Sequence, residues 1–226
     1  MTLEIFPDRA AQARACADAI AAALPEQGRA SLIVTGGSSV GETYDVLAAM
    51  DLGWQRITVA LSDDRWVPPE TPESNARLVR SRLLVGKAAA AAFEPLAHGG
   101  ASPAEDALAA EPLVARLAPF AAVLLGMGED GHIASLFPTD PHRADFLDPD
   151  YEHLVVGVPV AGLAPFVPRI SLTVAALLLS HEILILISGA AKRALVERVL
   201  SDPAYDPPVA ALLRQDHVPV RVLWTA

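Results

Sequence analysis

Residues 121–138 read AAVLLGMGEDGHIASLFP, an uncharged apolar run that stops in glycines beside two acids and a histidine. The apolar part, residues 121–125, is typical of a short strand covered on both faces of a sheet. The glycines that follow permit backbone angles that other residues resist, so we expect a tight loop after the strand. His132 and Asp130 would then lie at the C-terminal end of a strand, where open α/β sheets bind ligands.

The rest of the chain alternates apolar runs with helical patterns. Strands are predicted over residues 3–6, 31–35, 57–61, 93–96, 121–125, 153–160, 183–187 and 220–224, and helices over 9–24, 41–50, 75–84, 103–117, 173–179 and 190–200. The proline-rich stretches 62–75 and 138–151 are predicted to be loops, the second a surface excursion near the site. This order predicts one α/β domain over residues 1–226, with a mainly parallel sheet covered on both faces.

Composition excludes several classes of protein. A formal net charge of -10 repels polyphosphate, and the basic residues do not cluster, so we expect no nucleic-acid partner. Residues 170–189 are strongly apolar but carry Glu182 near their centre, which argues against a membrane span. No signal peptide is visible, and the single cysteine, Cys16, lies in an alanine-rich helical stretch as a buried thiol would. These features predict a cytoplasmic protein with no membrane partner.

Two further turns follow predicted strands. The turn TGGSSVGE, residues 35–42, opens a helix, and backbone N–H groups at such a start bind phosphate well, although the turn taken alone favours an ordinary strand-to-helix connection. Asp63, Asp64 and Arg65 follow the strand 57–61 and are either site residues or a solvated loop.

Two cations also precede or open helices. Arg169 is expected just before a helix, and Lys192 lies in the first turn of another, against the helix dipole. A bound anion would explain Lys192; the alternative is an exposed side chain.

His132 is the strongest single candidate, because a histidine can take a proton from water near neutral pH and a neighbouring carboxylate can orient it. Activity should then fall as the histidine becomes protonated in acid. A loop histidine bonded to backbone is the alternative. Metal binding by Asp130, His132 and His142 is a third interpretation, but no established zinc spacing is present.

Four ordered stretches resemble the 6-phosphogluconolactonase family: LLGMGEDGHIASLFP from Leu124, TGGSS from Thr35, DDRWVPPETPESN from Asp63, and RISLT from Arg169 with GAAKR. The resemblance implies a modified Rossmann-like α/β/α sandwich. It also implies hydrolysis of 6-phospho-D-glucono-1,5-lactone to 6-phosphogluconate in the oxidative pentose phosphate pathway, with no cofactor and no metal. The partner would be this sugar-phosphate lactone, and the protein a monomer or small homo-oligomer.

The resemblance also implies roles for individual residues. His132 would be the general base, Asp130 its support, and Arg65 a contact of either the phosphate or the oxyanion. The remaining substrate and phosphate contacts would be Gly36, Gly37, Ser38, Asp64, Arg169 and Lys192.

The chain departs from the family pattern at a few positions, of which Ile133 is the most informative. The lactonases usually have threonine there, and the related glucosamine-6-phosphate deaminases often have isoleucine. Deaminase or isomerase chemistry is therefore one alternative, although residues 135–138 follow the lactonase pattern. A regulatory module that binds sugar phosphates on the same fold is another.

Overall fold

The computed structural model describes residues 1–37, 39–159 and 164–226. A seven-stranded parallel sheet in the order β1-β10-β9-β6-β2-β3-β5 forms its centre. Its strands are β1 (Thr2–Phe6), β2 (Ala30–Val34), β3 (Ile57–Leu61), β5 (Ala92–Glu94), β6 (Ala122–Gly126), β9 (Ile183–Ser188) and β10 (Val220–Thr225). Every pair in this sheet is parallel, which confirms the predicted α/β class.

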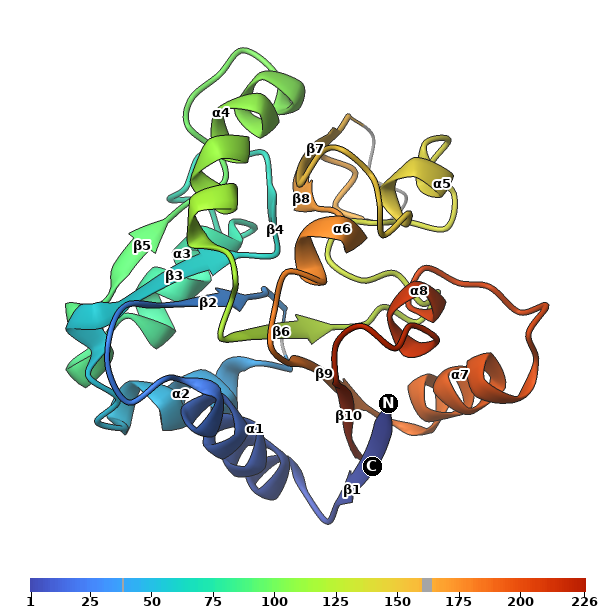
Figure 1. Cartoon of the computed structure of the whole chain (residues 1–226), viewed down its shortest axis with the longest axis horizontal. Coiled ribbons are helices and arrows are strands. Elements are labelled where there is room, and N and C mark those ends of the chain that lie inside the picture. Colours follow the sequence, from blue (N-terminus) through green and yellow to red (C-terminus); the bar gives the residue numbers. More distant parts are fainter. Residues whose placement is uncertain (38, 160–163) are drawn as a thin grey trace.

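Helices cover both faces of this sheet, with α1 and α2 on one side and α4 and α6 on the other (Figure 1). The helices are α1 (Arg9–Ala23), α2 (Gly41–Ala49), α3 (Asn75–Leu78), α4 (Pro103–Leu117), α5 (Arg143–Phe146), α6 (Val174–Leu177), α7 (Ala190–Ser201) and α8 (Ala210–Leu213). Their starts follow local chemistry. Asp8 and Ser102 each accept a backbone N–H as N-cap residues of α1 and α4, and Pro103 occupies the first helical position of α4.

A second, three-stranded antiparallel sheet was not predicted. It consists of β4 (Asp63–Arg65), β8 (Arg169–Leu172) and β7 (Val155–Val158), in the order β4-β8-β7. The prediction of an unbroken loop over residues 62–75 is therefore wrong, because β4 lies within that stretch. Arg169 was expected directly before a helix, but it is the first residue of β8, which precedes α6. The strand predicted over residues 153–160 spans four residues, and its predicted end at residue 160 lies outside the described residues.

The core fills the space between the large sheet and its helices. Leu124 and Leu125 of β6 are fully buried, as expected for a strand covered on both faces. Cys16 is also fully buried within α1, which confirms the predicted buried thiol. The first and last strands of the chain, β1 and β10, pair in parallel, and Arg221 of β10 binds Glu4 of β1. Within the described ranges, none of the helices combines the length and apolarity that a membrane crossing requires.

Candidate active site

A cavity of about 260 Å³ lies at the C-terminal ends of β2, β6 and β9 and is closed on one side by β4 and β8. Six of the nine predicted site residues line it: Gly36, Gly37, Arg65, His132, Arg169 and Lys192. A larger cavity, of about 650 Å³, lies at the opposite ends of the strands beside Ser31 and Thr58, and none of the predicted residues lines it. The smaller cavity is the candidate site because His132, which is paired with Asp130, faces Arg65, Arg169 and Lys192 there.

His132 and Asp130 form a hydrogen-bonded pair in the loop after β6. The distance from His132 Nδ1 to Asp130 Oδ1 is 2.6 Å, and the His132 backbone N–H donates to the same oxygen at 3.1 Å. Burial alone would raise the pKa of Asp130, but the two donors of His132 outweigh it and lower this pKa. An ionised Asp130 holds the proton on Nδ1, so Nε2 is left to accept a proton from a reactant. Any residue other than glycine at position 128 would disturb this pair, because its Cβ would overlap the His132 ring.

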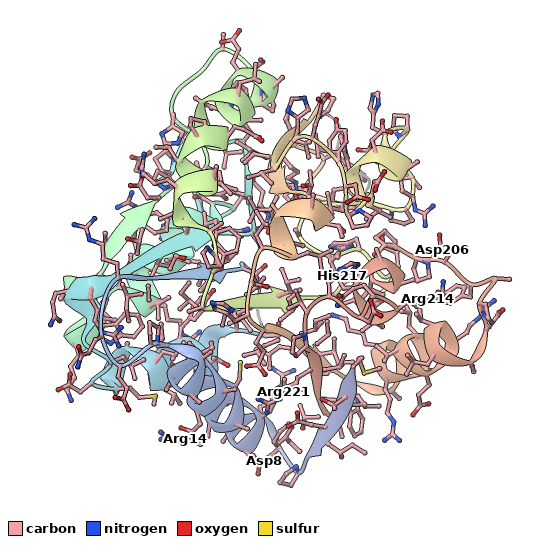
Figure 2. All side chains as sticks on the ribbon, viewed as in Figure 1. Asp8, Arg14, Asp206, Arg214, His217 and Arg221 are labelled. Atoms are coloured by element: carbon pink, nitrogen blue, oxygen red, sulfur yellow. The ribbon has the colours of Figure 1, made fainter. Side chains whose placement is uncertain are left out.

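The same loop is supported from behind by the chain between α7 and α8. Gly131 has a φ of +81°, and a Cβ there would lie 2.5 Å from Pro207 Cβ. The Val209 N–H donates to the Gly131 carbonyl at 2.9 Å. Asp206, next to this proline, bonds Arg214, and the two side chains lie together in Figure 2. The loop that carries the histidine is thus pressed against a segment from the C-terminal part of the chain.

Two arginines face each other across the small sheet. Arg65 and Arg169 are direct partners in the β4–β8 pair, where like charges are destabilising unless something lies between them. Burial and the charge of Arg65 lower the pKa of Arg169, which is 5% exposed. Among the residues that the structure describes, the buried Nε atoms of both arginines have no hydrogen-bond partner. An anion bound between the guanidinium groups would satisfy both the charge and the unpaired donors.

The glycine turn and Lys192 complete the cationic side of the cavity. Gly36 and Gly37 connect β2 to α2, and Gly37 has a φ of +98° that favours glycine. Lys192 lies in the first turn of α7, next to Ser188 at the end of β9. Ser38, the third predicted residue of the turn, lies outside the described residues. The turn and the lysine therefore face the same cavity as His132, from two different parallel strands.

Asp64 was predicted to contact substrate, but the structure does not place it on the cavity. Its carboxylate accepts backbone N–H groups from Arg65, Asn75 and Ala76 at 2.7, 2.6 and 3.0 Å. Burial raises the pKa of Asp64 to about 6, while the N–H donors of Asn75 and Ala76 oppose that rise. The residue joins β4 to the start of α3 and thus supports the site from within the protein.

Sequence reasoning missed several residues that the structure brings to the cavity, among them Arg9, Asn75 and Ala134. Asp63, which the sequence left open as either a site residue or part of a solvated loop, also lines the cavity. It accepts a hydrogen bond from Ser135 Oγ at 2.7 Å, which ties β4 to the histidine loop. Arg9 opens α1 beside a helix cap, and nothing in its local sequence marks it as a site residue.

Ile133, the position that departs from the lactonase pattern, does not face the cavity. Its side chain is fully buried, and its carbonyl accepts the Leu136 N–H at 2.9 Å. Ala134, which follows, has a φ of +48° and turns the chain back toward the cavity. The isoleucine is therefore a core residue beneath the loop.

Metal binding through Asp130, His132 and His142 finds no geometric support. Over residues 1–37, 39–159 and 164–226, no three His, Cys, Asp or Glu side chains are grouped so as to hold a metal ion.

A parallel α/β sheet with a histidine–aspartate pair and converging cations at its C-terminal edge defines an enzyme for a small anionic substrate. A sequence model of the family described as glucosamine-6-phosphate isomerases/6-phosphogluconolactonase matches residues 8–224. The chain belongs to this family.

Relatives within the family carry the lactonase name. A 6-phosphogluconolactonase from Caulobacter vibrioides is 44% identical over 98% of this chain and 96% of its own length. One from Mesorhizobium japonicum is 38% identical over 97% of this chain and 93% of its own length. The crystal structure of a 6-phosphogluconolactonase from Shewanella baltica superposes with a TM-score of 0.92 at 31% identity, covering 100% of this chain and 98% of that one.

Proposed function

We propose that this chain is a lactone hydrolase that converts 6-phospho-D-glucono-1,5-lactone to 6-phosphogluconate. The similarity to 6-phosphogluconolactonases over nearly the whole chain supports the substrate. A single structural observation carries the mechanism. One cavity is lined by His132, which is paired with Asp130, and by Arg65 and Arg169, whose buried Nε donors have no partner among the described residues.

The two arginines are assigned to the substrate phosphate. Repulsion between Arg65 and Arg169 exists before any reaction, so the group that relieves it has to be negative in the bound substrate. A phosphate meets this condition, whereas an oxyanion is negative only in the transition state. Lys192 and the N–H groups of the Gly36–Gly37 turn add further donors. Anchoring the phosphate holds the ring ester in place and converts binding energy into orientation.

His132 then acts on a water molecule. Its Nε2 removes a proton as the water oxygen attacks the C1 carbonyl carbon, and the carbonyl becomes a tetrahedral oxyanion. Backbone N–H groups of the glycine-rich loops supply donors to this oxyanion. The bond from C1 to the ring oxygen breaks as the oxyanion collapses, and the protonated His132 returns the proton to the departing ring oxygen. Asp130 stabilises the imidazolium in between.

Proton release from freshly generated lactone, corrected for spontaneous hydrolysis, tests this function. His132→Ala should lower kcat by about 10²- to 10⁴-fold and leave substrate affinity largely intact. His181→Ala is the matched control, because that histidine is exposed beside the cavity at the opposite ends of the strands. Near-normal turnover of His132→Ala would refute the mechanism. Binding of the sugar phosphate without any hydrolysis by the wild-type protein would instead favour a regulatory module.

A further inference from the structure

Asn75, the first residue of α3, makes hydrogen bonds to all three residues of β4. Its Oδ1 accepts Nη1 of Arg65 at 2.6 Å, and its Nδ2 donates to the Asp63 carbonyl at 2.8 Å. Its backbone N–H donates to Asp64 Oδ1 at 2.6 Å. The residue is 2% exposed, so these bonds form in a poorly solvated place where they are stronger than in water.

The hydrogen bonds allow the Asn75 amide one orientation. Arg65 only donates and the Asp63 carbonyl only accepts, so a flipped amide would oppose donor to donor and acceptor to acceptor. Nη1 of Arg65 also donates to the Glu73 carbonyl at 2.8 Å. Two acceptors thus hold one nitrogen of the guanidinium, while the buried Nε of the same group has no partner within residues 1–37, 39–159 and 164–226.

Gly36 leaves the space that the Asn75 amide occupies. A Cβ built on Gly36 would overlap Oδ1, Cγ and Nδ2 of Asn75, so any other residue at position 36 would displace the amide. The amide is therefore packed between the backbone of the glycine turn and the guanidinium of Arg65. Through this one side chain, the position of the arginine is set relative to the turn that follows β2.

We propose that Asn75 is a positioning residue that acts through Arg65, orienting its guanidinium and the Gly36 turn toward the same anionic group of the substrate. This inference rests on the proposed function, in which that group is the phosphate. An arginine released from Asn75 would keep its charge but lose its fixed direction, and bidentate recognition of phosphate depends on direction. The main effect of losing Asn75 should thus be on substrate binding.

A double-mutant cycle tests the proposal through KM and kcat. Asn75→Ala should lower kcat/KM by about 10- to 100-fold, mostly through KM, as expected when a hydrogen bond to a charged group is lost. Arg65→Ala should cause at least this loss. In the Arg65→Ala background, Asn75→Ala should change kcat/KM by about twofold or less, because the group it positions is absent.

Two further variants separate positioning from folding. Ser74→Ala removes the cap of α3 and a bond to Asp64 but touches no part of Arg65, so it should lower the melting temperature and leave KM within about twofold. Asn75→Asp keeps an acceptor for Arg65 and should retain a lower KM than Asn75→Ala. If Asn75→Ala does not fold, Asn75→Asp and Arg65→Ala form the cycle instead. In the Arg65→Ala background, Asn75→Asp should again change kcat/KM by about twofold or less.

Equal losses from Asn75→Ala in the wild-type and Arg65→Ala backgrounds would overturn the proposal, and so would equal KM values for Asn75→Asp and Asn75→Ala. A wild-type protein that does not hydrolyse the lactone would refute the proposed function instead. The two failures are therefore distinguishable.

Discussion

Replacing Ile133 by threonine should destabilise the protein without changing the reaction that it catalyses. The isoleucine is fully buried under the histidine loop. Ile133→Val should cost about 1 kcal/mol for the lost methyl group. Threonine has the shape of valine but buries a hydroxyl, which adds about 1 to 3 kcal/mol where it finds no partner. The free energy of unfolding should thus fall by about 2 to 4 kcal/mol in Ile133→Thr.

Urea unfolding of the wild type, Ile133→Val and Ile133→Thr measures this difference, and the valine variant isolates the hydroxyl from the lost volume. Lactone hydrolysis, assayed well below the melting temperature, should stay within about threefold in kcat/KM for both variants, as expected for a residue without substrate contact. Neither variant should release ammonia from glucosamine 6-phosphate. A tenfold change in either activity in Ile133→Thr, or destabilisation no greater than that of Ile133→Val, would refute the assignment of this residue to the core.

Three other predictions concern the site itself. Gly131→Ala and Gly99→Ala each place alanine at a positive φ, which should cost about 1 to 2 kcal/mol in urea unfolding. In Gly131→Ala the added Cβ also clashes with Pro207, so this variant should be the less stable of the two, and only it should lower kcat because the clash shifts the histidine loop. Asp130→Asn should lower kcat about 10²-fold in the proton-release assay. Because the pKa of Asp130 is lowered in the folded state, its carboxylate contributes stability above about pH 4, and this contribution is lost as the pH falls below that value. The free energy of unfolding of Asp130→Asn should therefore depend less on pH than that of the wild type in this acid range. Arg169→Met should raise KM at least about tenfold while the melting temperature is unchanged or higher, since repulsion from Arg65 disappears.

The large sheet could be predicted because its determinants are local. Uncharged runs such as residues 121–125 and 183–187 need no distant partner to be recognised as buried strands. Helix starts at Asp8 and Ser102 follow from the hydrogen bond that each side chain makes with the next turn. The histidine loop could be predicted from local sequence as well, because glycines next to a strand end indicate a turn wherever the strand lies in the sheet.

The small sheet could not be predicted, because its determinants are distant. Asp63–Arg65 contains no apolar residue, and it is a strand only because residues about a hundred positions later supply its hydrogen-bond partners. The pairing of Arg65 with Arg169 follows from that register and has no trace in either local sequence. Asn75 is hidden for a similar reason, since beside Ser74 it looks like an ordinary helix start.

The division of the site between two sheets bears on how one fold can serve different reactions. The parallel sheet contributes the histidine loop, the glycine turn and Lys192, while the antiparallel sheet contributes both arginines. Asp63 ties the small sheet to the histidine loop through its hydrogen bond with Ser135, and Asn75, which bonds Arg65, packs against Gly36 of the glycine turn. A residue alters the reaction if it touches the reactants or if it holds in place a group that does, as Asp130 holds His132. Whether a buried residue such as Ile133 matches the lactonases or the deaminases therefore says little about the reaction. The residues that line the cavity carry most of that information.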